Sequence, residues 1–277
     1  MDSILTAKGL TKKYSKFTLG ELDLEIPKGF ATALIGANGA GKTTLIDALC
    51  GVIRKNDGDV TYFGQYKDID CPEVREKIGY CASSAFFPQG WTAKDIAMSM
   101  ELAFKGFSRE KFRSLCEQLD VDSDITKKPR QMYKQSDGNR MRTSLAAVFA
   151  RETDLLVLDE PGSSLDPLMR DRLCDRLREY LDNGNGEKSV IFSTHNIADM
   201  ENAADYAIFM DKGRIIEQGF VEDLKEKYII ARGAAEDYDK VKDMLMSHSK
   251  NRTVFDGLAL AEKAAYSTKR MEPLGLM

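Results

Sequence analysis

The glycine-rich segment Gly36–Thr44, with the sequence GANGAGKTT, constrains this chain more than any other feature. It fits the spacing G-x-x-x-x-G-K-[ST], follows the short apolar run Ala31–Ile35 and precedes the helical pattern Thr43–Cys50. A strand, a glycine-rich turn and a helix in this order form a loop whose backbone N–H groups can surround phosphate oxygens. The sequence therefore predicts an α/β protein with a P-loop NTPase core.

The residue types in this loop suit a nucleoside triphosphate. Glycines let the backbone turn its N–H groups inward, and the helix N-terminus adds a partial positive charge. Lys42 supplies a mobile cation for the β- and γ-phosphates, Thr43 a hydroxyl for Mg²⁺, and Thr44 can reach the α-phosphate. A glycine-rich turn without function is the alternative interpretation. The residues of the loop expected to bind ATP are Gly36, Ala37, Asn38, Gly39, Ala40, Gly41, Lys42, Thr43 and Thr44.

A second motif, Leu155–Pro161 with the sequence LLVLDEP, points to hydrolysis. Its four apolar residues predict a buried strand that carries Asp159 to the carboxyl edge of the sheet, where ligands bind in such folds. Asp159 can hold Mg²⁺, directly or through water, because hard cations prefer oxygen ligands. Glu160 can orient and deprotonate an attacking water. A strand ending in Asp-Glu is common by itself, so this motif takes its weight from the glycine-rich loop.

The order of predicted elements gives the domain organisation. A mainly parallel sheet is preceded by N-terminal antiparallel strands and interrupted by a helical insert over about residues 84–152. Residues 1–230 are expected to form this domain, and residues 231–277 a small C-terminal extension of unknown role. The predicted strands include Leu22–Ile26, Ala31–Ile35, Val60–Phe63, Ile78–Cys81, Leu155–Leu158, Val190–Ser193 and a closing hairpin of Tyr206–Met210 and Arg214–Glu217; the predicted helices of the insert are Ala93–Phe104, Arg109–Leu119 and Asn139–Phe149.

Composition argues against several classes of function. The net charge of −4 disfavours nucleic acid as a partner. Five cysteines without CxxC spacing and only two histidines disfavour structural zinc and fit a reducing compartment. The N-terminus lacks a signal-peptide pattern, and no apolar run approaches the roughly 20 residues that span a bilayer. The sequence thus predicts a cytoplasmic protein that reaches a membrane only through a partner.

In their order and spacing, these motifs resemble the nucleotide-binding domain of ABC transporters. The P-loop, the helical insert, the DEP strand, the SSLD segment Ser163–Asp166 and the STH segment Ser193–His195 span about residues 3–230. The resemblance implies a motor in which two domains enclose two ATP–Mg²⁺, each held by the P-loop of one subunit and the signature of the other. It also implies a membrane permease as partner, a homodimer or a heterodimer with another ABC ATPase, and a peripheral location on the inner face of the cell membrane.

The resemblance assigns roles outside the two motifs. Tyr14, upstream of the P-loop, matches the aromatic residue on which adenine stacks. His195 matches the switch histidine that contacts the γ-phosphate, and it joins Glu160 and Lys42 as the expected catalytic set. Asp166 matches the D-loop, which in the family crosses the dimer interface; it also suits the cap of the following helix.

The signature motif departs from the family pattern. It is usually LSGGQ, whereas residues 135–139 read QSDGN. Ser136 and Gly138 are retained and are expected to hold the γ-phosphate bound by the opposite subunit. Asp137 places a negative charge near that phosphate, which weakens closure unless one of the two following arginines compensates.

The Q-loop departs as well, because Ser83 occupies the position of the glutamine that contacts Mg²⁺ and the attacking water. Ser83 keeps the family spacing to Trp91-Thr92, whereas Gln89 would need another register and is expected near the permease contact. Serine is too short to replace glutamine unless a water bridges the gap, so slower or partner-dependent hydrolysis is the hypothesis. This replacement and the short tail resemble bacterial exporter-type ATPases with a separately encoded permease.

Two other interpretations stay open. One is a nucleotide-dependent switch or assembly subunit with little hydrolysis, which the two departures favour and which Glu160 and His195 oppose. The other is a soluble ABC ATPase without a transport role, although the chain shows no coiled-coil insert, zinc module or second cassette. The sequence identifies neither the transported substrate nor the direction of transport.

Overall fold

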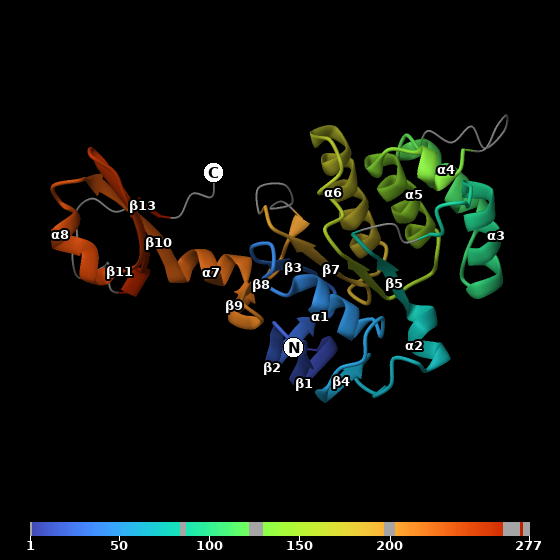
Figure 1. Cartoon of the computed structure of the whole chain (residues 1–277), viewed down its shortest axis with the longest axis horizontal. Helices are drawn as coiled ribbons and strands as arrows, with labels where there is room; N and C mark the ends of the chain where they lie inside the picture. The colour runs from blue at the N-terminus through green and yellow to red at the C-terminus, as the bar shows by residue number, and fades with distance from the viewer. Residues whose placement is uncertain (1, 84–86, 122–129, 197–202, 263–271, 274–277) are drawn as a thin grey trace. The chain divides into compact units, whose positions relative to one another are not determined.

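The computed structural model describes residues 2–83, 87–121, 130–196, 203–262 and 272–273. The chain forms two compact units, Met1–Gln218 and Gly219–Met277 (Figure 1). The second unit therefore begins before residue 230, where the sequence analysis placed the boundary, and residue 230 itself lies within a strand of the second unit.

Six strands form the central sheet of the first unit, in the order β5-β6-β7-β3-β8-β9. The first five of these pair in parallel, which confirms the predicted parallel core. Because parallel strands end at one edge of the sheet, the segments that follow β3, β6 and β7 meet there. The strands are β3 (Ala31–Ile35), β5 (Ile78–Cys81), β6 (Leu155–Leu158), β7 (Ser189–Thr194), β8 (Tyr206–Asp211) and β9 (Arg214–Phe220).

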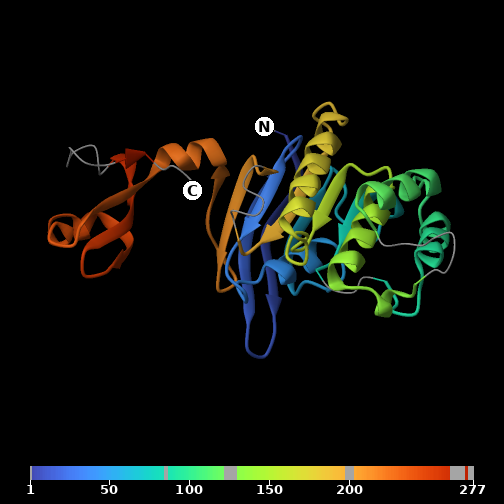
Figure 2. The same cartoon turned by 90° about the horizontal axis from the view of Figure 1, so that it is seen from above.

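Different layers cover the two faces of this sheet (Figure 2). On one face, Leu156 and Leu158 of β6 pack with the helical insert and with α6 (Pro167–Asp182). On the other, Leu155 and Val157 pack with α1 (Lys42–Leu49) and the N-terminal strands. Burial on both faces explains why the strands of the central sheet read as continuous apolar runs.

The N-terminal strands form a separate antiparallel sheet in the order β2-β1-β4, as predicted. Its strands are β1 (Ser3–Lys13), β2 (Thr18–Pro27) and β4 (Asp57–Tyr62), and α2 (Pro72–Lys77) follows them. The sequence analysis did not identify β1, whose register shifts near Ala7, Leu10 and Lys12 interrupt the alternation that marks a strand.

The helical insert contains α3 (Ala93–Ala103), α4 (Arg109–Gln118), the short helix η1 (Met132–Lys134) and α5 (Asp137–Phe149). Side chains fix the first turn of each α-helix. Thr92 forms a capping box before α3, and Ser108 and Ser136 accept backbone N–H bonds before α4 and α5. The three predicted helices of the insert therefore begin and end within two residues of their expected bounds.

A tight turn joins β8 to β9 and packs against the P-loop. Lys212 and Gly213 both have positive φ, of 45° and 77°, as hairpin turns of two residues require. The Gly213 N–H donates to the Ala40 carbonyl at 2.8 Å, and the Gly213 carbonyl accepts from Gly20 N–H at 3.1 Å. The predicted closing hairpin thus forms a wall behind the loop.

The second unit is a small α/β fold. Its antiparallel sheet has the order β11-β12-β10-β13. Phe255 and Ala259 are buried in it, and the Tyr238 ring packs against Phe255. The elements are α7 (Val221–Lys227), β10 (Tyr228–Ala234), α8 (Tyr238–Val241), η4 (Lys242–Met244), β11 (Leu245–Lys250), β12 (Val254–Leu260) and β13 (Glu272–Pro273). None of the helices in the described ranges is long and apolar enough to cross a membrane.

Candidate nucleotide-binding site

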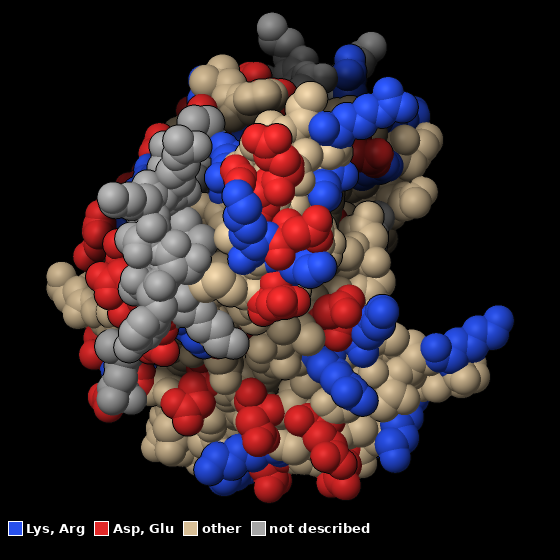
Figure 3. Space-filling model, turned by 90° about the vertical axis from the view of Figure 1, so that its left-hand side faces the viewer, with Lys and Arg blue, Asp and Glu red and all other residues tan. Residues whose placement is uncertain are grey.

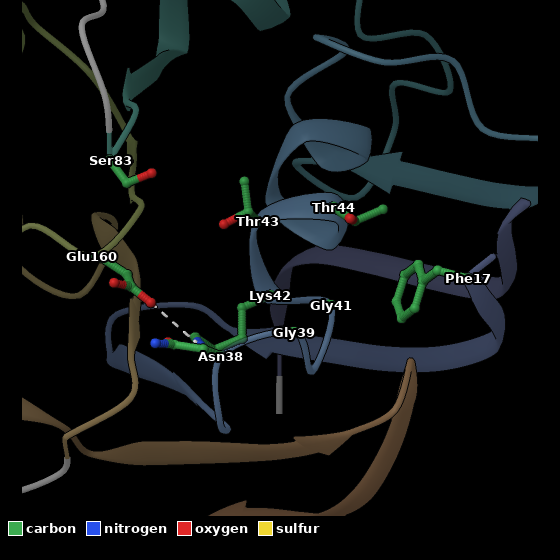
Figure 4. A pocket seen from close by; sticks show the side chains of 9 residues that line it. All are labelled: Phe17, Asn38, Gly39, Gly41, Lys42, Thr43, Thr44, Ser83 and Glu160. Atoms are coloured by element: carbon green, nitrogen blue, oxygen red, sulfur yellow. Dashed lines mark ion pairs between the residues drawn. The ribbon is translucent and has the colours of Figure 1, made fainter. Parts of the chain in front are cut away.

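A cavity of about 650 Å³ lies at the carboxyl edge of the central sheet, within the size range of ligand pockets. The P-loop forms its floor, Phe17 lies at one end, and Glu160 and Ser83 lie at the other (Figure 4). Six residues of the predicted loop motif line it: Asn38, Gly39, Gly41, Lys42, Thr43 and Thr44. The structure therefore brings residues from four separate parts of the sequence to one pocket.

Two glycines of the loop are required by its conformation. Gly41 has φ 107° and immediately precedes α1, so the loop enters the helix through a backbone state that side chains disfavour. A Cβ atom on Gly36 would lie 2.5 Å from the Met210 carbonyl oxygen. The first three residues of α1 line the cavity, and the N–H groups that a helix leaves without intrahelical partners at its start suit a phosphate.

Lys42 is only 4% exposed, yet its ammonium group lies at the cavity. Its Nζ donates to the Gly36 carbonyl at 2.8 Å and to the Ala37 carbonyl at 3.3 Å, and it lies 3.4 Å from Glu160 Oε1. Two loop carbonyls and one carboxylate therefore hold the charge in place. This arrangement holds the cation at the cavity that the P-loop lines.

Asp159 is 1% exposed, and each of its carboxylate oxygens accepts a hydrogen bond from a hydroxyl group. Oδ2 accepts from Thr43 Oγ1 at 2.8 Å, and Oδ1 accepts from Ser193 Oγ at 2.6 Å. Among the described residues no lysine or arginine lies within ion-pair distance of Asp159, although a buried carboxylate is costly without a positive partner. Thr43 and Asp159 offer the hard oxygen donors that Mg²⁺ prefers, so the residues present fit the metal.

The negative charge of Asp159 affects its neighbours. Burial raises the pKa of the Cys81 thiol to about 12, and the Asp159 charge adds to this rise. Burial also raises the pKa of Asp47, with Asp159 contributing and the Tyr80 hydroxyl opposing the change. Cys81 is therefore a neutral thiol at physiological pH, and the negative potential at the end of β6 is of the kind that a divalent cation neutralises.

Glu160 contacts both Lys42 of the loop and His195. Its Oε1 faces Lys42, and its Oε2 lies 3.2 Å from His195 Nδ1. The backbone of Glu160 has φ 46°, in the left-handed region that costs a non-glycine residue about 1–2 kcal/mol. The three predicted catalytic residues thus lie in contact, with His195 the most exposed of them at 43%.

The aromatic residue that lines the cavity is Phe17, which the sequence analysis did not select. Tyr14, the predicted stacking residue, is absent from the lining and is 47% exposed, with Lys12 Nζ over its ring at 5.3 Å. The Tyr14 N–H donates to the Phe17 carbonyl at 2.8 Å, so both residues belong to one turn between β1 and β2. Aromatic character within this turn was the available signal, and it did not distinguish the two residues.

Ser83, the predicted third metal-site residue, is exposed and lines the cavity beside Glu160. Gln89 instead lies near the signature segment, where its carbonyl accepts from Tyr133 N–H at 3.0 Å. The structure therefore brings Ser83 to the pocket and places the backbone of Gln89 beside η1.

Ser136, Gly138 and Asp166 do not line the cavity of their own chain. Ser136 and Asp166 cap α5 and α6, where their side chains accept from Asn139 N–H and Met169 N–H. Gly138 lies so close to Ser164 that an added Cβ would stand 2.8 Å from the Ser164 carbonyl oxygen. The segment of Ser136 and Gly138 therefore lies beside the segment that contains Ser164 and Asp166, and none of these residues lines the nucleotide pocket.

The signature's acidic residue is paired within its own helix. Asp137 forms an ion pair with Arg140, one of the two arginines that the sequence analysis named as compensating. The other, Arg142, lies within ion-pair distance of Asp120 at 3.6 Å. The pair with Arg140 reduces the negative charge that this signature presents at the start of α5.

Comparison with known proteins gives one family. The sequence profile of the family described as ABC transporter matches residues 19–163, just over half of the chain. An energy-coupling factor transporter ATP-binding protein, EcfA2, from Methanospirillum hungatei is 33% identical over 229 residues, which are 79% of this chain and 56% of that protein. A daunorubicin resistance ATP-binding protein, DrrA3, from Streptomyces coeruleorubidus is 31% identical over 228 residues, 81% of this chain and 70% of that protein. The chain thus spans little more than half the length of the first relative.

Solved structures agree. An ATP-binding subunit of an ABC transporter superposes with a TM-score of 0.69 at 25% identity, over 80% of this chain and 92% of that one. A dimeric ATP-binding cassette in a post-hydrolysis state with ADP and Pi gives a TM-score of 0.66 at 19% identity, over 78% and 98%, and shows the shared fold. From the matched profile, the relatives and the pocket, we conclude that this chain belongs to the ABC transporter family, as an ATP-binding cassette.

Proposed function

We propose that this chain is the ATP-hydrolysing motor subunit of an ABC transporter. The observation that carries the proposal is that Lys42, Thr43 and Glu160 line one pocket, with Lys42 beside Glu160 and with Thr43 hydrogen-bonded to the buried Asp159. Phosphoryl transfer needs little besides positioning and charge neutralisation, and these residues supply both. The named relatives, an energy-coupling factor protein and a daunorubicin resistance protein, support a role in transport.

The pocket gives each residue a task in hydrolysis. The adenine base of ATP would lie toward Phe17 and the γ-phosphate toward Glu160, because these two residues occupy opposite ends of the cavity (Figure 4). Lys42 and the N–H groups of α1 oppose the negative charge of the phosphates. Thr43 and Asp159 would hold Mg²⁺, which neutralises charge on the phosphate oxygens. Glu160 would orient water for attack on the γ-phosphorus and accept its proton, while the bond from the γ-phosphorus to the bridging oxygen breaks and ADP leaves. His195 contacts that carboxylate from the other side.

The ion pair between Lys42 and Glu160 makes the availability of Glu160 as general base depend on ATP binding. Lys42 Nζ lies 3.4 Å from Oε1, so in this arrangement the loop lysine occupies one oxygen of the carboxylate. A phosphate that binds to Lys42 replaces Glu160 as its partner and leaves the carboxylate able to take a proton from water. Hydrolysis therefore follows binding without a separate step that activates the base.

A second cassette completes the site in this proposal. Ser136 and Gly138 lie outside the pocket of their own chain, although the start of α5 offers a hydroxyl and helix N–H groups suited to a phosphate. Two copies, or this chain and a different ABC ATPase, would each supply a signature to the other's ATP. Gly138 lies close to Ser164, and Asp166 follows Ser164 by two residues, so Asp166 would lie at the same interface.

The first experiment combines Glu160→Gln with light scattering. The variant should bind ATP–Mg²⁺ without hydrolysing it, because the amide cannot accept the proton, and a typical loss is about 10²–10⁴-fold in turnover. We expect the mass to double when ATP and Mg²⁺ are added. A monomer that binds ATP would indicate a different cassette as partner, whereas failure to bind ATP would contradict the motor function itself.

The permease contact is proposed at a second cavity, of about 400 Å³, between the core and the insert. Val52, Ile69, Met100 and Phe104 give it an apolar lining. An apolar cytoplasmic segment of a permease suits such a groove and would hold the chain at the inner face of the membrane. Val52→Arg should leave ATP binding unchanged but prevent co-purification with the permease. Val254→Arg, at another exposed valine, is the matched control.

A nucleotide-dependent switch with little hydrolysis is the second candidate, and Ser83 favours it. This side chain lies at the catalytic end of the cavity and is much shorter than glutamine. Turnover near background in the presence of the permease, with ATP-dependent closure retained, would support the switch.

A soluble ABC ATPase that acts on DNA or ribosomes has less support, since acidic and basic side chains are interspersed on the face in Figure 3.

A further inference from the structure

Ser193 occupies a central position in the hydrolytic site without lining the nucleotide pocket. It is the fifth residue of β7, two positions before His195, and its side chain is 0% exposed. Its neighbours along β7, Phe192 and Val190, pack as ordinary core residues. A small polar side chain in this buried strand needs partners, and it has two.

Both partners of Ser193 belong to the hydrolytic machinery. Ser193 Oγ donates to Asp159 Oδ1 at 2.6 Å and accepts from the Glu160 backbone N–H at 2.8 Å. A hydroxyl has one proton and two acceptor sites, so these two bonds are compatible and fix its orientation. Thr43 holds the other oxygen of Asp159 at 2.8 Å. The hydrogen bonds thus run without a break from the Glu160 backbone through Ser193 and Asp159 to α1.

The bond to Glu160 acts on a backbone that is otherwise disfavoured. Glu160 has φ 46°, so its peptide unit needs external contacts to stay in this conformation. Ser193 holds the N–H of the residue, while Ser163 N–H and Ser163 Oγ hold its carbonyl at 3.1 and 2.9 Å. With both ends fixed, the side chain points toward Lys42 and His195.

We propose that Ser193 is a positioning residue that sets the direction of the general base Glu160 and the metal-binding carboxylate Asp159 through one hydroxyl. This inference rests on the proposed ATPase function for its kinetic consequence, but not for its structural one. Ser193 does not line the nucleotide pocket. Its loss therefore acts on the turnover and on the Mg²⁺ requirement and leaves the contacts to ATP in place.

The test compares Ser193→Ala with Ser189→Ala and Ser193→Thr. Ser189 is a matched control, because it is also 0% exposed on β7 and also accepts a backbone N–H, that of Gly29 at 2.9 Å. Ser193→Thr retains the hydroxyl. If Ser193→Ala does not fold, Ser193→Cys takes its place, since a thiol is a weak hydrogen-bonding group of similar size.

The first readout needs neither nucleotide nor metal. Amide hydrogen exchange is followed in the peptide that contains Glu160, in the full chain. Loss of the acceptor should speed exchange of this peptide about tenfold in Ser193→Ala, with little change in Ser189→Ala and recovery in Ser193→Thr. Equal exchange in Ser193→Ala and the wild type would overturn the proposal.

The second readout is catalysis. Ser193→Ala should lower kcat about 10–100-fold and raise the half-saturating Mg²⁺ concentration several-fold, as removal of a group that orients a metal ligand commonly does. KM for ATP should stay within about threefold, because uniform binding is untouched. A rise in KM at unchanged kcat would contradict the positioning role. Absence of hydrolysis by the wild type would contradict the proposed function and leave the exchange readout to decide on Ser193.

Discussion

At the scale of single residues, we expect the binding of the adenine base to depend on Phe17. Its half-buried ring lines the cavity. A Cβ atom on Gly41 would stand only 2.8 Å from Phe17 Cζ, so the ring packs closely against the P-loop. Base stacking on an aromatic ring contributes about 1–3 kcal/mol. Phe17→Ala should therefore weaken ATP binding about tenfold in a fluorescent-nucleotide displacement assay. Tyr14→Ala should change it less, and the reverse order would restore Tyr14 as the stacking residue.

Ser83 is the second residue whose effect can be measured directly. Ser83→Gln lengthens the side chain at the catalytic end of the cavity, so it should reach Mg²⁺ and the attacking water without a bridging water. We expect kcat to rise several-fold with KM little changed, in a steady-state phosphate-release assay. Unchanged turnover would show that Ser83 does not limit hydrolysis.

The sequence supports residue-level prediction where a role is tied to a fixed local spacing. Lys42, Thr43 and Glu160 line the pocket, and Asp159 contacts Thr43, because strand, turn and helix dictate their positions. Ser193 could not be selected in this way. Its role depends on β7 lying beside β6 in the sheet, and nothing in its neighbouring residues states that pairing.

At the scale of elements, a buried arginine fastens the end of the insert to the core. Arg151 follows α5 and is 5% exposed. Its guanidinium donates to the carbonyls of Ile78, Arg75 and Glu76 at 2.9–3.0 Å and lies over the Phe104 ring at 3.4 Å. Burial lowers its pKa to about 10, so it remains charged at physiological pH.

Removal of this arginine should destabilise the first unit. Arg151→Ala removes the side-chain donor from three carbonyls and is expected to cost about 2–4 kcal/mol in the free energy of unfolding, measured by urea denaturation. Lysine should restore little, because it lacks the planar fork. Arg113→Ala, at an exposed position on α4, should change stability by less than about 0.5 kcal/mol. Equal effects of the two alanine variants would contradict the anchoring role.

Elements with their own end signals were the predictable ones. The Thr92 and Ser108 caps and the apolar faces of α3 and α4 made their bounds readable. The second unit had no such pattern, since its apolar residues are divided among short strands whose pairing joins Tyr228–Ala234 to Val254–Leu260. Pairing between segments this far apart in the chain leaves little trace in a local window.

At the scale of the whole molecule, the first unit has a self-sufficient core. Both of its apolar clusters are composed of residues up to Met210, with Ile215 packed against one of them. A fragment of residues 1–220, which keeps β9 whole, should fold cooperatively and bind ATP within about threefold of the full chain. Circular dichroism melting and nucleotide titration test this. An insoluble or non-binding fragment would show that the second unit is needed for the core.

The turn that joins β8 to β9 has a consequence for how mutations in this chain should be interpreted. A Cβ on Gly213, which does not line the cavity, would stand 2.2 Å from the Thr18 carbonyl oxygen and 3.2 Å from Phe17 Cζ. A substitution there would move the wall, and with it the base-stacking ring and the loop that Gly213 N–H supports through Ala40. Loss of nucleotide affinity would follow at a residue that no ligand touches. In a genetic screen, substitutions at position 213 would therefore show the same loss of nucleotide binding as substitutions in the P-loop, although most of the sequence of the first unit separates the two sites.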